Sequence, residues 1–220
     1  MGLATGLTAA LAGLAAAPAH ALPMGSQGTW MVMADTTPDS AELAANYAWT
    51  QRDALGVAAA RWDEKPHAGA PHAHALKRRF DSLTYTRRLH RWNLPDAQAN
   101  LWFVAMAGSA RAQERTGSEG MGAVSLLADY ETTRLYTGAG LRAMRSASLR
   151  HDTVYARAGF SLYEVEYEEV QPWLVLEVKR ERYRHVTSNT VTPMLRLIHR
   201  RYFYLTLRNI SLKCSMPFRD

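Results

Sequence analysis

The stretch VQPWLVLEVKRER, residues 170–182, carries the pattern that decides the fold. In its centre every second residue is apolar, at Leu174, Leu176 and Val178. The opposite positions carry charge from residue 177 onward, at Glu177, Lys179 and Glu181. Alternation with a period of two predicts a β-strand, because successive side chains of a strand point to opposite faces.

The same alternation recurs on both sides of this stretch, while helical periodicity is poor after residue 27. It appears upstream at 41–50 and 152–165, and downstream at 191–199 and 202–210. The pattern therefore predicts a succession of strands rather than a mixture of strands and helices.

A change of phase within 122–141 divides this segment in two. Up to Tyr130 the apolar residues occupy even positions, whereas after residue 133 they continue at Leu135, Ala139 and Leu141. A change of phase needs a bulge or a turn. Because Glu131–Arg134 can form a tight turn, we predict two strands here.

We predict twelve strands in total, with ten as the second choice. Short turns and longer links then alternate, as in outer-membrane barrels with short periplasmic turns and longer external loops, and both chain ends lie in the periplasm. The predicted strands span 28–35, 41–50, 54–63, 80–92, 99–110, 121–131, 134–142, 152–165, 170–182, 191–199, 202–211 and 212–218. The longer links fall at 64–79, 111–120, 143–151 and 183–190.

Composition favours a membrane setting for these strands. No segment after the N-terminus reaches the roughly 18 uninterrupted apolar residues of a spanning helix. Only helices and closed barrels satisfy every backbone hydrogen bond in lipid. Tryptophans near the predicted strand ends fit the aromatic girdles of the membrane interfaces. They are Trp30, Trp49, Trp62, Trp92, Trp102 and Trp173.

The predicted fold class is therefore all-β, a transmembrane antiparallel up-and-down β-barrel in the outer membrane of a Gram-negative bacterium. Outer-membrane lipids are its expected partners. The alternative is a soluble periplasmic β-sandwich or lipocalin-like barrel. Its strands would alternate in the same way, with the apolar face turned inward.

The N-terminus predicts export. Residues 1–21 are interpreted as a signal peptide, with a transmembrane anchor as the alternative, and residues 22–220 as the barrel. Ala19-His20-Ala21 fits the small-x-small cleavage pattern, although no Lys or Arg precedes Arg52. Export argues against a nucleic-acid partner despite the net charge of +6. The single Cys214 cannot form an internal disulfide.

Three segments resemble small bacterial outer-membrane barrels of unassigned function. These are Arg91–Asn100, the opening 22–33 with Leu22-Pro23-Met24-Gly25 and Gly28–Met33, and Asp129–Thr137. The likeness covers about residues 22–200. It implies an outer-membrane location and, weakly, a role near heavy-metal handling, and it implies no catalytic residue.

The C-terminus departs from that pattern. Outer-membrane barrels typically end on an alternating strand with a terminal aromatic residue, which the barrel-assembly machinery reads. Here Pro217 interrupts the strand, and Arg219 and Asp220 follow Phe218. We therefore expect the assembly machinery as a partner, acting on an atypical last strand.

Two groups of residues are candidate metal ligands. Neutral imidazoles bind Cu(II), Ni(II) or Zn(II), and the link 64–79 holds His67, His72 and His74. Divalent transition-metal ions are therefore candidate partners. Near the mature start, the thioethers of Met24, Met31 and Met33 suit Cu(I). The alternatives are a solvated loop for the histidines and ordinary apolar packing for the methionines.

Charged residues on the polar faces form a predicted lumen. They are Glu42, Asp129, Glu131, Arg157, Glu177, Lys179, Arg196 and Arg208. A fully paired set would plug the barrel, whereas an unpaired excess of one sign would select ions. We expect a channel or an accessory protein in envelope transport, with metal ions as a candidate solute. The alternative is a non-conducting structural or binding barrel. No catalytic motif is present, so no enzyme and no cofactor is predicted.

Overall fold

The computed structural model describes most of the predicted barrel segment. The described residues are 24–37, 40–64, 76–112, 117–163, 169–183, 186–199, 203–208 and 212–214. The predicted signal peptide, 1–21, lies outside them. Within them no helix is long and apolar enough to cross a membrane.

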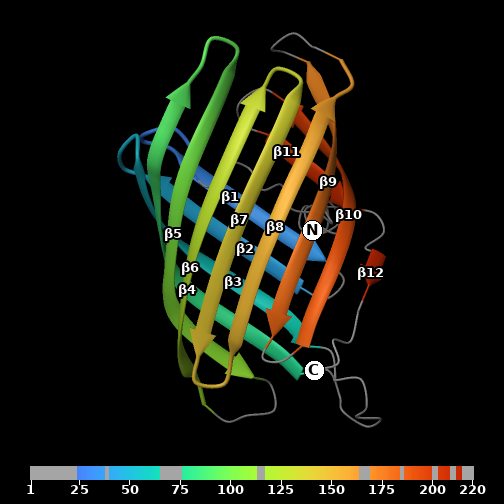
Figure 1. The fold of residues 1–220 in the computed structure, drawn as a ribbon. Helices are drawn as coiled ribbons and strands as arrows, with labels where there is room; N and C mark the ends of the chain where they lie inside the picture. The colour runs from blue at the N-terminus through green and yellow to red at the C-terminus, as the bar shows by residue number, and fades with distance from the viewer. Residues whose placement is uncertain are drawn as a thin grey trace, which may run out of the picture.

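The structure is all-β, and its strands follow one another around a single sheet (Figure 1). Strands β1 to β10 are antiparallel and pair in chain order, which is the up-and-down topology that the sequence predicts. The strands are β1 (Trp30–Thr37), β2 (Ser40–Ala48), β3 (Asp53–Glu64), β4 (Leu76–Asn93), β5 (Ala97–Ala112), β6 (Glu119–Thr132), β7 (Leu135–Ser146), β8 (Arg150–Ser161), β9 (Val170–Tyr183), β10 (Val186–His199), β11 (Phe203–Arg208) and β12 (Leu212–Cys214).

The last two segments share one edge of the sheet. β11 pairs with the second half of β10, and β12 pairs with Asn189–Val191 of the same strand. Arg208 is opposite Met194 and Leu212 is opposite Val191, so both segments lie along the same strand. The predicted strand 212–218 therefore does not follow 202–211 as a twelfth strand of the up-and-down order, because β12 lies along β10.

The sheet curls strongly but is not closed. Figure 1 shows β1–β3 behind β5–β9 and running across them at an angle. In the described part of the chain β1 pairs with β2 alone, so the predicted closure of the barrel is not seen there. The curl nevertheless gives every strand an inward and an outward face.

The predicted split of 122–141 is confirmed. β6 ends at Thr132 and β7 begins at Leu135, so the hairpin turns through Thr133 and Arg134. The Thr132 hydroxyl accepts hydrogen bonds from the backbone N–H groups of Arg134 and Leu135, at 3.1 and 2.8 Å. This side-chain turn explains the change of phase, because it reverses the chain without an extended loop.

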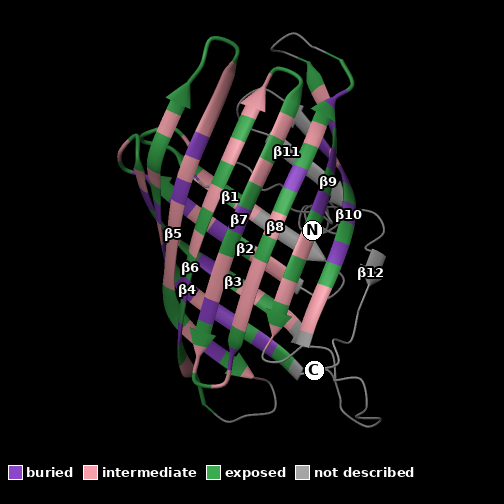
Figure 2. Cartoon of the chain, in the orientation of Figure 1, coloured by how far each residue is buried: buried purple, intermediate pink, exposed green. Residues whose placement is uncertain are grey.

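Exposed and more buried residues alternate along the strands (Figure 2). Many large apolar side chains are exposed on the outward face, whereas the inward face mixes polar and apolar residues. On β9 the alternation is as predicted. Leu174, Leu176 and Val178 are 42%, 49% and 50% exposed, whereas Glu177 is 1% exposed. Outward apolar residues on the other strands include Leu43, Val57, Leu83, Val124, Leu126, Leu141, Val154, Phe160 and Val191.

The tryptophans divide between the two faces. Trp30, Trp49 and Trp92 are exposed, as girdle residues would be. Trp102 and Trp173 are buried on the inner face, and Trp62 packs there against Phe80 and His151. The prediction that all six lie in interfacial girdles was therefore wrong for three of them.

The strands are longer than predicted at the end that carries the link 65–75, the lower end in Figure 1. β4 has 18 residues and β5 has 16, whereas a tilted membrane strand needs about 9–11. Most of the predicted links 143–151 and 183–190 are therefore strand. At the opposite end, residues 162–169 separate β8 from β9, so the predicted alternation of short and long links does not hold throughout.

Candidate functional site inside the curved sheet

A buried ion pair lies at the centre of the inner face. Arg157 of β8 and Glu177 of β9 are directly opposite each other in the register. Arg157 Nε and Nη2 lie 2.6 and 2.5 Å from Glu177 Oε2. Both residues are buried, at 7% and 1% exposure. A buried charge is costly unless it is paired, and in this contact each charge neutralises the other.

Two arginines of the inner face each lie against a tyrosine ring. The guanidinium of Arg157 lies 4.4 Å from the ring centre of Tyr155, and that of Arg196 lies 5.2 Å from the ring centre of Tyr136. Both separations fall within the range of cation–π attraction. Next to them, Trp173, Val175 and Met194 form an apolar cluster with Tyr136 at its edge.

A second polar group lies nearer the end of the sheet that carries the β4–β5 and β6–β7 turns. Asn100 of β5 and Asp129 of β6 are opposite each other, and Asn100 Nδ2 donates to Asp129 Oδ1 at 2.7 Å. Trp102 Nε1 donates to the other carboxylate oxygen at 2.6 Å, and Arg91 Nε donates to Asn100 Oδ1 at 2.8 Å. Both oxygens of Asp129 are therefore used, and the buried indole of Trp102 has its partner.

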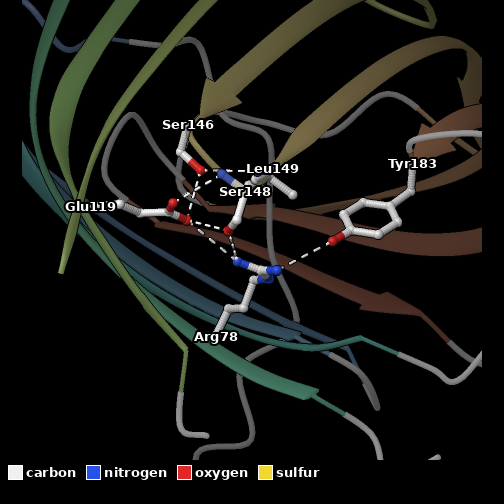
Figure 3. Close-up of polar contacts among 6 residues, drawn as sticks. All are labelled: Arg78, Glu119, Ser146, Ser148, Leu149 and Tyr183. Atoms are coloured by element: carbon white, nitrogen blue, oxygen red, sulfur yellow. Dashed lines mark hydrogen bonds and ion pairs between the residues drawn. The ribbon is translucent and has the colours of Figure 1, made fainter. Parts of the chain in front are cut away.

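A third polar group lies at the opposite end of the interior (Figure 3). Arg78 of β4 is 4% exposed and contacts Glu119 of β6, with 3.5 Å between Nη1 and Oε1. It also donates to Ser148 Oγ at 2.9 Å and to Tyr183 of β9 at 3.5 Å. Glu119 in turn accepts from the hydroxyls of Ser146 and Ser148 and from the Ser148 backbone. One carboxylate thus joins β4, β6 and the β7–β8 turn.

An apolar cluster packs beside this group on the inner face. Leu149 is the last residue of the β7–β8 turn and is 2% exposed. Its cluster comprises Phe80, Ala110, Met121, Ala123, Met144 and Leu149, with Trp62 and Tyr183 at the edge. Bulky side chains therefore occupy the interior at this end as well.

The predicted lumen residues fall into several separate contacts rather than one set. Glu42 lies 3.7 Å from Arg142, and Lys179 lies 3.1 Å from Glu181. Glu131 is half-buried on the inner face of β6, near the turn to β7. Arg208 lies in β11 opposite Met194, and its side chain is outside the described residues.

The two predicted metal sites receive no support from the described side chains. His67, His72 and His74 lie outside the described residues, so that site stays a prediction. Within the described part of the chain no group of three His, Cys, Asp or Glu residues could hold a metal ion. Met24 is buried beside Ala48, Ala54 and Trp102, which is apolar packing, while Met31 and Met33 are half-buried on β1.

The interior is thus built for packing and pairing. Arg78, Glu119, Ser148 and Tyr183 were not predicted as site residues, because all four lie in segments that were predicted to be links. Arg142, the partner of Glu42, also fell at the end of a predicted strand. The alternation offered a signal for Arg78, which lies an even number of residues before Phe80, and for Glu119, which lies two residues before Met121.

Comparisons with models of known protein families, with curated proteins and with solved structures found no match. The resemblance to small outer-membrane barrels therefore stays a prediction from the three quoted segments.

Proposed function

We propose that this chain is an outer-membrane β-barrel whose interior is closed by side chains, and that it acts as a structural or binding barrel rather than as an open channel. The observation that carries the proposal is the placement of apolar and charged side chains, which is the reverse of that in a soluble protein. The outward face is apolar, and the most buried ion pair, Arg157–Glu177, lies inside.

The outward face supports the membrane part of the proposal. On β9 it is apolar at Val170, Leu174, Leu176 and Val178, a stretch of nine residues, and the outward residues beyond it are Arg180 and Arg182. About 9–11 tilted residues cross the hydrocarbon layer. A soluble periplasmic barrel would bury such side chains and expose the charged ones, so this alternative is disfavoured.

The inner face supports the non-conducting part. Trp102, Trp173, Met144 and Leu149 are all less than 2% exposed on this face. These side chains lie beside the charged contacts. They do not leave the row of unpaired charges of one sign that ion selection would require. The expectation of a channel for metal ions needs a continuous water path, and this packing weighs against one.

Single-channel recording tests the proposal. The refolded chain, in planar bilayers of phosphatidylethanolamine and phosphatidylglycerol, is expected to insert without steady conductance. Insertion is checked on the same sample by heat-modifiable migration on gels, because a closed barrel resists detergent until it is boiled. Stable open-state currents would overturn the closed interior, and failure to show heat-modifiable migration would overturn the membrane barrel.

A further inference from the structure

Three arginines form a row across the outward face of β3, β4 and β5. Arg61 is directly opposite Arg79, and Arg79 is directly opposite Arg111. Directly paired residues of antiparallel strands project from the same face of the sheet. All three are exposed, and the side chain of Arg79 is 70% exposed.

The row holds an excess of positive charge. Arg79 Nε lies 3.2 Å from Asp81 Oδ2, but the side chains of Arg61 and Arg111 make no hydrogen bond or ion pair with a described side chain. Lys77, exposed two residues before Arg79, is directly opposite Asp63, so the excess of positive charge comes from the three arginines. Like charges directly opposite each other destabilise a sheet, so a bound anion would reduce the repulsion between the arginines.

The arginines elsewhere near this end of the sheet are arranged differently. On β7 and β8, Arg145 is directly opposite Arg150, which makes a pair rather than a row of three, and Arg145 Nη2 lies 2.6 Å from Asp152 Oδ1. On β9, Arg180 is opposite Val154 and Asn189 rather than another arginine. Among the described strands, a row of three directly opposed arginines is thus found on β3–β5 alone.

An apolar groove begins next to the arginine row on the same outward face. Its lining includes Leu43, Ala45, Val57, Ala59, Leu83 and Ala107. Ala59 lies two residues before Arg61 on β3, and the groove also reaches Ser109, two residues before Arg111 on β5. Two residues of a strand span about 6.6 Å, so the groove and the row are contiguous.

We propose that the groove and the arginine row together bind the phosphorylated glycolipid of the outer leaflet, lipid A, with an acyl chain in the groove and its phosphates on Arg61, Arg79 and Arg111. The proposal rests on the proposed function and on the predicted orientation, in which the longer links, 64–79 among them, lie on the outer side. Guanidinium groups bind phosphate through paired hydrogen bonds. The row spans two strand spacings, about 10 Å, which suits a headgroup with two phosphates better than one with a single phosphate.

Calorimetric titration of the full chain, folded in detergent, tests this site with diphosphoryl lipid A as the probe. The double variant Arg61→Gln/Arg111→Gln should bind about tenfold more weakly or worse, because two charge-assisted contacts are lost. The matched control, Arg180→Gln/Arg182→Gln, removes the same charge from the outward face of β9 and should change the affinity by less than about twofold.

Two other ligands and a second variant distinguish binding of lipid A from binding of other anions. Inorganic pyrophosphate and phosphatidylglycerol should each bind far more weakly than diphosphoryl lipid A. Filling the groove by Ala59→Leu/Ala107→Leu should weaken lipid A binding and leave pyrophosphate binding unchanged.

Four results would overturn the site: no loss in the arginine variant, an equal loss in the β9 control, equal binding of phosphatidylglycerol, or insensitivity of lipid A binding to the groove variant. Heat-modifiable migration is recorded on every sample. A folded barrel that fails to bind lipid A contradicts this site alone, whereas a chain that never folds as a barrel contradicts the proposed function first.

Discussion

The Arg157–Glu177 pair offers a quantitative test of the closed interior. In Glu177→Leu the guanidinium of Arg157, itself 7% exposed, loses the carboxylate that lies 2.5–2.6 Å away. Breaking a buried pair by removing one partner typically costs about 3–5 kcal/mol. The free energy of unfolding should fall by this amount, because little water reaches the cation that is left behind.

Two comparisons make this loss interpretable. The double variant Arg157→Met/Glu177→Leu removes both charges and should recover most of the loss, since apolar replacement of a whole buried pair is often neutral. The exposed pair Arg145–Asp152 has a similar separation, 2.6 Å, with side chains 44% and 37% exposed. Asp152→Asn should therefore cost no more than about 1 kcal/mol.

The assay is equilibrium unfolding in urea of the chain folded in phosphatidylcholine vesicles, followed by tryptophan fluorescence. Buried Trp102 and Trp173 should report loss of the interior packing. If Glu177→Leu costs as little as Asp152→Asn, water reaches Arg157 in the folded chain. The closed interior would then be refuted.

Three other predictions concern the outward face, the strand packing and the link 64–79. Leu176→Arg should hinder folding into vesicles by about 2–4 kcal/mol, and Lys179→Leu far less, as measured by the folded fraction on gels; equal effects would refute the assigned faces. Gly108→Ala should cost about 1–3 kcal/mol in urea unfolding, because its Cβ would lie 2.1 Å from the Asp81 carbonyl oxygen, whereas Gly122→Ala, with 3.9 Å to its nearest atom, should be tolerated; the reverse order would contradict the β4–β5 packing. Cu(II) or Ni(II) binding, measured by calorimetry, should appear only above about pH 6, because protonated imidazole is not a ligand, and should vanish when three histidines are replaced by alanine. Binding that survives the triple change, or no binding to the unmodified chain, would rule out a site made by His67, His72 and His74.

The sequence predicts the strands best where each has one apolar face. On β9 the alternation of Leu174, Leu176 and Val178 with Glu177 gives the strand and its faces directly. The hairpin at Thr132 is predictable for the same reason, since a change of phase requires the chain to turn. Local pattern is sufficient in both cases.

The ends of the strands are harder to predict. β10 begins at Val186, followed by Thr187, Ser188, Asn189 and Thr190, which are polar on both faces. Such a stretch reads as a loop by itself. It forms a strand because β9 continues beside it as far as Tyr183, so the partner, not the local sequence, decides its length.

The interior contacts depend on register, which local alternation does not supply. Trp102 and Phe103 are adjacent and both aromatic, so either could be the inward residue. Asp129 on β6 resolves the choice, because its carboxylate accepts from the Trp102 indole. Arg157 and Glu177 were both expected in the lumen, but their direct pairing follows only once β8 and β9 are aligned.

The most direct test of the account is the lipid exposure of successive residues on β9. Single cysteines are introduced at 174 to 179 in a Cys214→Ala background, which removes the only native thiol, and each carries a spin label in lipid vesicles. Labels at 174, 176 and 178 should collide readily with oxygen, which concentrates in hydrocarbon, and rarely with a water-soluble nickel chelate. Labels at 175, 177 and 179 should be shielded from oxygen. Nickel collisions that dominate at 174, 176 and 178 would contradict the account, because these residues would then face water.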